Sequence, residues 1–136
     1  MANGDTKIIN EDYISQIKEF SGLHFGSITP TDIDCFFDFG DKIFIFIELK
    51  YGNAKLPFGQ RLALERLCDA CDSERRNSCL IIGRHTAKKG MKIDVASAIV
   101  SSVRWKRKWN PWTDKNDTVR ELIVKIKQWD GAHNAS

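Results

Sequence analysis

The sequence predicts a mixed α/β domain. Three observations lead to this fold class: apolar residues recur at helical spacing near both ends of the chain, β-branched and aromatic runs lie between them, and turn residues separate the runs. The 136 residues are 42% hydrophobic and 29% charged, which is typical of one globular domain with a buried core. We therefore expect a single domain over 1–136, with flexible ends at 1–9 and 131–136.

Each element is expected from its own local signals. Helices are indicated where apolar residues recur every three or four positions and a capping residue or proline precedes the first turn. Strands are indicated where β-branched and aromatic residues are dense and glycine or proline bounds the run. We also expect a basic loop over 88–92 and a break at Asn110-Pro111. The expected elements are a helix over 11–21, strands over 23–28, 33–39 and 43–50, a helix opened by Pro57, strands over 78–83 and 98–105, and a helix over 118–129.

The cysteines and the apolar runs argue against two classes of protein. The four cysteines, at positions 35, 68, 71 and 79, lie in apolar segments, so we expect reduced thiols and no disulfide framework. No apolar run approaches the roughly 20 residues of a membrane span, and the first residues do not have the pattern of a secretory signal. A soluble, cytoplasmic protein without a membrane partner is therefore expected.

Four charged residues flank an apolar hairpin in the sequence TDIDCFFDFGDKIFIFIELKYG. Asp32 and Asp34 precede one predicted strand, and Glu48 and Lys50 end the next. A three-residue loop over 40–42 would pair positions whose numbers sum to 82 and would place Asp34 across from Glu48. A two-residue loop would put these acids on opposite faces of the sheet, and we expect the three-residue loop.

Two facing carboxylates require a positive partner, because their Cβ atoms would lie about 5 Å apart. Mg²⁺ or Mn²⁺ is suitable, since magnesium is often held by one or two carboxylates and completes its shell with water and substrate phosphate. Lys50 would then orient the attacking water or stabilise charge that develops on the phosphate. The alternative is a half-exposed sheet whose charges face water, but it leaves Phe36, Phe44 and Phe46 exposed on the same face.

The stretch from about residue 10 to 84 resembles the PD-(D/E)xK nuclease superfamily. The signature of that superfamily is an acid on one strand followed by Glu-x-Lys on the next. Asp34 and the segment Glu48-Leu49-Lys50 match it, with Asp32 as the second choice for the first acid. The resemblance implies a restriction-endonuclease-like core of order αβββαβ, followed here by a C-terminal strand and helix, with a mixed sheet flanked by helices.

The same resemblance implies roles for individual residues. Asp34, Glu48 and the backbone carbonyl of Leu49 would bind Mg²⁺ or Mn²⁺, and Lys50 would assist the attack of water. Gln60 matches a glutamine that several branches carry at the start of the following helix, although it also fits an exposed first-turn residue. The tyrosine found four positions later in some exonuclease branches is absent, because position 64 is leucine.

The implied activity is that of a metal-dependent DNA endonuclease that hydrolyses phosphodiester bonds. A chain of this size is most similar to the compact, structure-selective members, which include Holliday-junction resolvases of DNA recombination and phage-encoded nucleases. Cutting two strands with one site per chain requires two chains, so a homodimer is expected on this analogy. The location would be the host cytoplasm if the protein is phage-encoded.

Basic residues gather late in the sequence, where they are suited to a polyanionic partner. In RWKRKWNPW, residues 104–112, cations alternate with tryptophans, which suits phosphate contact with base stacking. The same segment is equally consistent with a strand end whose tryptophans cover the core. The candidate DNA-binding residues are Arg61, Lys88, Lys89, Arg104, Lys106, Arg107 and Lys108.

Other features are expected to have ordinary roles. Cys68 and Cys71 have the spacing of half a zinc site, but they lie on the apolar face of a predicted helix, where thiols pack as small apolar groups. Glu11 and Glu19 lie off the apolar stripe of the first helix and are expected to be solvated. Two alternatives to a nuclease are open: a nucleic-acid-binding module that keeps the fold without cutting, and a structural or inhibitory protein that binds another protein.

Overall fold

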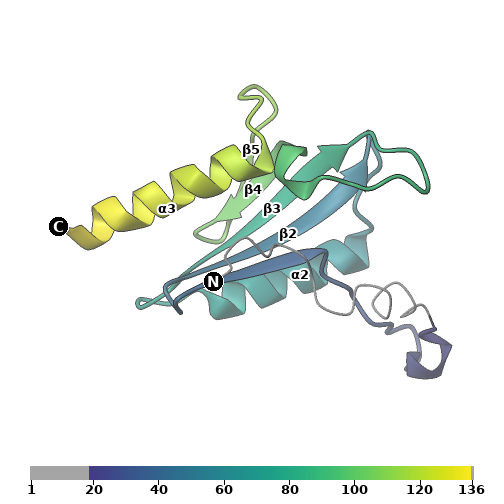
Figure 1. Cartoon of the computed structure of the whole chain (residues 1–136). Helices are drawn as coiled ribbons and strands as arrows, with labels where there is room; N and C mark the ends of the chain where they lie inside the picture. Colours follow the sequence, from purple (N-terminus) through teal and green to yellow (C-terminus); the bar gives the residue numbers. More distant parts are fainter. Residues whose placement is uncertain (1–18, 136) are drawn as a thin grey trace, which may run out of the picture. The chain divides into compact units, whose positions relative to one another are not determined.

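The structure, a computed structural model, describes residues 19–135, with side chains to residue 129 (Figure 1). The chain divides after Pro30 into two compact units, residues 1–30 and 31–136. The described part of the first unit contains the short 3-10 helix η2, Ser21–Leu23. The elements of the second unit are β1 (Cys35–Phe39), β2 (Ile43–Tyr51), α2 (Phe58–Cys71), β3 (Asn77–His85), the 3-10 helix η3 (Val95–Ser97), β4 (Ile99–Trp105), β5 (Lys108–Pro111) and α3 (Val119–Ala135).

The first unit differs from expectation where it is described. Residues 11–18 of the helix predicted over 11–21 lie outside the described residues. The strand predicted over 23–28 is wrong, because Phe25 and Ile28 form one isolated antiparallel bridge with reciprocal backbone hydrogen bonds of 2.9 and 3.0 Å. Gly26 has φ +67°, a left-handed conformation that reverses the chain where a strand would continue.

The second unit is built on one five-stranded sheet in the order β1-β2-β3-β4-β5 (Figure 1). β2 and β3 are parallel, with α2 as the crossover between them, and the other neighbouring pairs are antiparallel. α2 packs on one face of the sheet and α3 on the other. The predicted α/β class with a mixed sheet flanked by helices is confirmed. The described residues have two strands before α2 where three were expected, and the restriction-endonuclease-like order stays a prediction.

Alternation along β2 divides its side chains between the two faces of the sheet. The odd-numbered residues from Ile43 to Ile47 are at most 3% exposed and pack in the core beneath α3. The even-numbered phenylalanines of the same strand pack against α2. Because Glu48 and Lys50 continue the even-numbered series, their side chains belong to the α2 face.

The end of the sheet contains a strand that the sequence did not indicate. The break predicted at Asn110-Pro111 is wrong, because these residues end β5, which pairs with β4. Lys106 and Arg107 form the turn between the two strands with φ of 51° and 65°. Non-glycine residues rarely adopt this conformation, so the sequence has no recognisable turn signal there. Pro111 is tolerated because β5 is an edge strand.

The last helix presents the apolar face that its spacing predicts. Val119, Leu122 and Ile126 are at most 1% exposed and pack on the sheet. The helix continues beyond the predicted end at Trp129 to Ala135. No helix among the described residues has the length and apolar character to span a membrane.

A close packing contact at Gly83 gives a first testable prediction. A Cβ atom there would lie 2.8 Å from Leu49 Cδ2 and 3.3 Å from Val119 Cγ2, inside the core beneath α3. We expect Gly83→Ala to lower the free energy of unfolding by about 1–3 kcal/mol, because Leu49 would have to move within a packed interior. Gly59→Ala in α2 is the matched control, since a Cβ there meets nothing within 4 Å. Urea unfolding of both variants checks the prediction, and equal stabilities would contradict it.

Candidate active site

The hairpin register brings the two predicted acids to the same face of the sheet. β1 and β2 pair Cys35 with Ile47 and Phe39 with Ile43, so the partner numbers sum to 82 and the loop spans residues 40–42. The predicted three-residue loop is confirmed. Asp34 immediately precedes β1 and lies at the position across from Glu48, and its Oδ2 accepts a 2.7 Å hydrogen bond from the backbone N–H of Leu49.

The even-numbered phenylalanines of β1 and β2 lie on the same face of the sheet as the acids and pack against one another. Phe36 contacts Phe44 and Phe46 with ring centroids 5.1 and 4.9 Å apart. Phe46 is 4% exposed, Phe44 is half-buried and Phe36 is 46% exposed. Phe44 and Phe46 are therefore part of the α2-facing core, and the acids lie at the end of an apolar row.

Four predicted site residues form one bonded cluster. Glu48 is 2% exposed and receives a hydrogen bond from Nε2 of Gln60, which lies in the first turn of α2. The Nζ atom of Lys50 donates to Oε1 of the same glutamine at 3.4 Å. The carboxyl group of Asp34 lies close enough to Glu48 to raise its pKa. The fold thus brings together Asp34, Glu48, Lys50 and Gln60 from β2, α2 and the start of β1.

The electrostatics of the cluster favour an added cation. Burial raises the pKa of Glu48 to about 8, and the carboxyl groups of Asp34 and Asp32 contribute to the increase. The ammonium group of Lys50 opposes it. Near neutral pH, a proton therefore relieves the repulsion between the acids. A divalent cation can replace that proton, because it stabilises both ionised carboxylates.

The donor set fits a magnesium-type ion. It consists of carboxylate oxygens and no sulfur or imidazole, which is the ligand chemistry that Mg²⁺ prefers. Asp34 is exposed, so the pair can be reached from solvent on that side. Among the described residues, no group of three or more His, Cys, Asp or Glu side chains is arranged around a common point for a metal. A magnesium site with two carboxylates needs further ligands from water, substrate phosphate or a backbone carbonyl such as that of Leu49.

The raised pKa of Glu48 predicts a pH-dependent affinity for Mg²⁺. Below about pH 8 the metal must displace a proton, so the affinity should rise up to about tenfold per pH unit between pH 6 and 8 and then level off. Without metal, the folded protein retains a proton that the unfolded chain loses above about pH 4.5. The contribution of Glu48 to the free energy of unfolding should therefore fall between about pH 4.5 and 8. Calorimetric titration with Mg²⁺ at several pH values measures the first effect, and an affinity that does not change with pH would contradict it.

A cleft of about 440 Å³ adjoins the cluster on the side of β3. Ile82 and Arg84 line it, and they are the parallel-strand partners of Glu48 and Lys50. Lys55 and Arg61 line it as well, so three cations surround the cavity, and none of its lining residues within the described part of the chain is acidic. Arg84 also donates a hydrogen bond to the carbonyl of Ala54, which anchors the guanidinium beside the cleft. The cleft is therefore suited to an anion such as a phosphate group.

Arg61, a candidate from the sequence, lines the cleft. Arg84 and Lys55 line it too, although the sequence did not indicate them as candidates. Arg61 is 52% exposed and forms an ion pair with Glu65 at 3.2 Å, which leaves part of its guanidinium for another anion. Only the parallel register of β2 and β3 reveals Arg84 as the neighbour of Lys50. The sequence does contain a basic residue near the end of the strand after α2. Its relation to Lys50 can be recognised only when the two strands are aligned in parallel.

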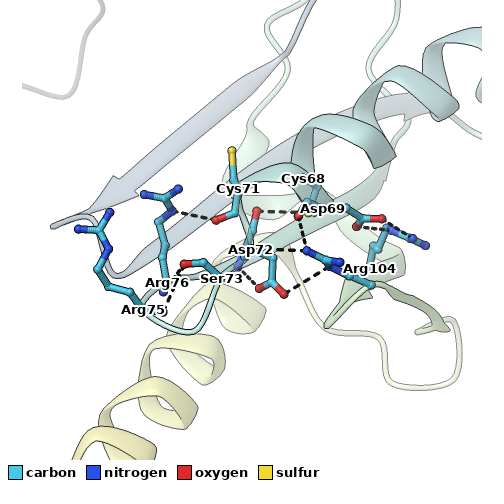
Figure 2. A network of polar contacts seen from close by, with 10 residues as sticks. Cys68, Asp69, Cys71, Asp72, Ser73, Arg75, Arg76 and Arg104 are labelled. Carbon is cyan, nitrogen blue, oxygen red and sulfur yellow. Dashed lines mark hydrogen bonds and ion pairs between the residues drawn. The ribbon is translucent and has the colours of Figure 1, made fainter.

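Two of the predicted DNA-binding cations are occupied within the fold. Arg104 donates two hydrogen bonds to the carboxylate of Asp69, of 2.9 and 2.7 Å, and its side chain is 14% exposed. These contacts lower the pKa of Asp69. Arg107 donates to the backbone carbonyl of Asp69 at 3.1 Å and lies 3.8 Å from the carboxylate of Asp72. Figure 2 shows Arg104 within this network at the C-terminal end of α2. Both guanidinium groups thus have partners within the fold, and DNA binding by Arg104 and Arg107 stays a prediction.

The tryptophans of 104–112 are half-buried and pack against the two cores, which agrees with the interpretation that they cover the core. Trp105 and Trp112 pack at the edge of the core beneath α3, where both contact Trp129 with ring centroids 5.9 and 6.4 Å apart. Trp109 packs against the other core, and its Nε1 donates to Glu65 at 2.5 Å.

The remaining lysine candidates are exposed on loops and turns. Lys106 and Lys108 are exposed at the β4–β5 turn, and Lys88 and Lys89 are exposed on the loop after β3. Glu19 accepts a local hydrogen bond from the backbone of Ser21, and Glu11 lies outside the described residues.

The cysteines do not form a metal site in the described part of the chain. Cys68 and Cys79 are at most 2% exposed and are members of the two cores, as expected for apolar packing. Burial raises the pKa of the Cys68 thiol to about 11. A thiol with so high a pKa is a poor source of thiolate for metal binding.

The chain was also compared with known proteins. No family model, curated protein or solved structure matches it. The assignment of function therefore depends on the chemistry of the cluster and of its surroundings.

Proposed function

We propose that the chain is a metal-dependent DNA endonuclease of the PD-(D/E)xK type that hydrolyses phosphodiester bonds. The observation that carries the proposal is the meeting of Asp34 and Glu48 on one sheet face, in one bonded cluster with Lys50 and Gln60. Two carboxylates, an ammonium group and an amide in this order match the signature to which the sequence is similar. The hairpin, the α2 crossover and the parallel β3 support a nuclease core of this type.

In the proposed mechanism, Asp34, Glu48 and the Leu49 carbonyl would hold Mg²⁺ or Mn²⁺. When bound, the ion would neutralise phosphate charge and lower the pKa of a water ligand. Lys50 contributes a positive charge beside the reacting phosphate, where it stabilises the charge that develops as water attacks. Gln60 bonds to both Glu48 and Lys50 and so fixes their distance from each other.

The cationic cleft gives the proposal its substrate. Lys55, Arg61 and Arg84 lie next to the acids and are suited to the phosphates that neighbour the cleaved bond. Lys88 and Lys89 extend this positive charge at the end of β3. We expect these cations to contact the phosphate backbone, which carries no sequence information, and this is consistent with a nuclease that selects its substrate by DNA shape, such as a junction-resolving enzyme. A homodimer, with one site for each strand, belongs to the same proposal.

A cleavage assay tests the proposal. Purified protein is incubated with branched, duplex and single-stranded DNA in Mg²⁺, in Mn²⁺ and in EDTA. We expect cleavage that requires the metal and is strongest on branched DNA. Binding without cleavage under every metal condition would favour the non-catalytic nucleic-acid-binding alternative, and cleavage that persists in EDTA would contradict the mechanism.

A further inference from the structure

A second cavity lies at the carboxyl ends of β2 and β3, the same end of the sheet as the proposed active site. We call it the Tyr51 pocket. It has a volume of about 580 Å³, and among the described residues it shares no lining residue with the cationic cleft. Tyr51 directly follows Lys50 at the end of β2. The residues that line the pocket are Tyr51, His85, Ala87, Lys88, Lys89, Gly90, Met91 and Ile93.

The walls of the Tyr51 pocket are aromatic and apolar. Tyr51 and His85 are partners in the parallel register, and their rings meet edge to face with centroids 5.7 Å apart. This contact orients the tyrosine, which nevertheless remains 57% exposed. Met91 and Ile93 are 64% and 43% exposed. Exposed apolar side chains gathered around one cavity are unusual for a surface without a ligand.

The rim of the pocket is positively charged. Lys88 and Lys89 begin a tight turn closed by a 3.0 Å hydrogen bond from the backbone N–H of Met91 to the carbonyl of Lys88. Gly90 takes φ +85° in this turn, which glycine adopts without strain. The turn therefore places two exposed ammonium groups beside the apolar walls. None of the residues that line the pocket, all in the described part of the chain, is acidic.

We propose that the Tyr51 pocket binds one unpaired nucleotide of the DNA strand that is cut at the acidic cluster, an inference that rests on the proposed function. A base offers a flat aromatic surface for Tyr51 and the apolar walls, and its phosphate offers a charge for Lys88 and Lys89. Paired bases are stacked within the duplex and cannot enter. Tyr51 follows Lys50 at the end of β2, but its side chain belongs to the opposite face of the sheet, so the DNA strand would pass over the end of the sheet between the cleaved bond and the pocket. The favoured substrates therefore have unpaired nucleotides near the cleaved bond, as in branched, flapped or overhanging DNA.

A fluorescent base in an uncut complex tests this inference. The probe is a duplex with a single-stranded overhang that carries 2-aminopurine at its first unpaired position, mixed with the full chain in EDTA. Stacking of the base on Tyr51 should quench the fluorescence. Tyr51→Phe should retain the quenching, whereas Tyr51→Ala should lose most of it and bind the probe about tenfold more weakly. Phe37→Ala is the control, because Phe37 is an exposed aromatic residue of the same sheet outside the pocket.

The possible results separate this inference from the nuclease proposal. Quenching that depends on Tyr51, in a protein that cuts no DNA with any metal, would support the pocket and overturn the activity. Metal-dependent cleavage with no quenching in the bound complex would overturn the pocket alone. A free 2-aminopurine nucleotide that is quenched as strongly at the same concentration would contradict the inference, since the pocket would then be a mononucleotide site. Absence of any DNA binding would overturn both.

Discussion

Glu48→Gln is expected to reduce metal-dependent cleavage by about a thousandfold or more. The amide has the size of the carboxyl group and can keep the hydrogen bond from Gln60, so the cluster should remain assembled. What it loses is one of the two negative charges that would hold the cation. Removal of one group that stabilises the developing charge typically lowers the reaction rate by a factor of the order of 10²–10³. Loss of the metal should lower the rate further.

The same substitution has a second effect that a merely destabilising change would not produce. Glutamine does not titrate, so the decrease in the free energy of unfolding expected between about pH 4.5 and 8 should become smaller in the variant. The rise of Mg²⁺ affinity with pH should disappear with it. Glu74→Gln is the control, because Glu74 is an exposed acid on the loop after α2. A Glu48→Gln protein that cuts DNA at the wild-type rate would contradict the proposed role of this residue.

Lys50→Met is expected to reduce the cleavage rate by about a hundredfold while leaving metal binding intact. Methionine keeps the apolar stem in the partly buried site and removes the ammonium group, which carries the proposed stabilisation of charge on the phosphate. Since Lys50 opposes the increase in the Glu48 pKa, its removal should raise that pKa further and move the pH dependence of Mg²⁺ affinity to higher pH.

Single-turnover cleavage and calorimetric titration distinguish these effects for Lys50. We expect a slower chemical step in the first experiment and, in the second, Mg²⁺ affinity close to that of the wild type only well above the raised pKa of Glu48. Lys42→Met is the control, because Lys42 is an exposed lysine in the hairpin loop at the opposite end of β2. Unchanged turnover in the Lys50 variant would remove this residue from the mechanism.

The sequence was sufficient to predict the acidic cluster because its geometry depends on local spacing. The length of one loop determines the register of the hairpin, and alternation along β2 then places Glu48 and Lys50 on the face of Asp34. The place of Gln60 in the cluster could be predicted as well, because Gln60 lies in the first turn of α2, the next element after β2.

The surroundings of the cluster could not be predicted in the same way, because they depend on contacts between distant segments. Arg104 looks like a free cation in the sequence, but its partner Asp69 is 35 residues away on α2. The turn at Lys106 and Arg107 uses backbone conformations that their residue types rarely adopt. Arg84 becomes a neighbour of Lys50 only through the parallel pairing of β2 with β3. Each of these features is determined by tertiary structure and not by a local pattern.

The central claim is that the carboxylates of Asp34 and Glu48 hold one divalent cation. Crystals grown above pH 8 and soaked in Mn²⁺ test it most directly, because manganese scatters anomalously and can be located without assumptions about the protein. We predict one anomalous peak within coordination distance of both carboxylates, and its loss in Glu48→Gln crystals. Crystals of the wild-type protein with no peak between these two side chains would contradict the account.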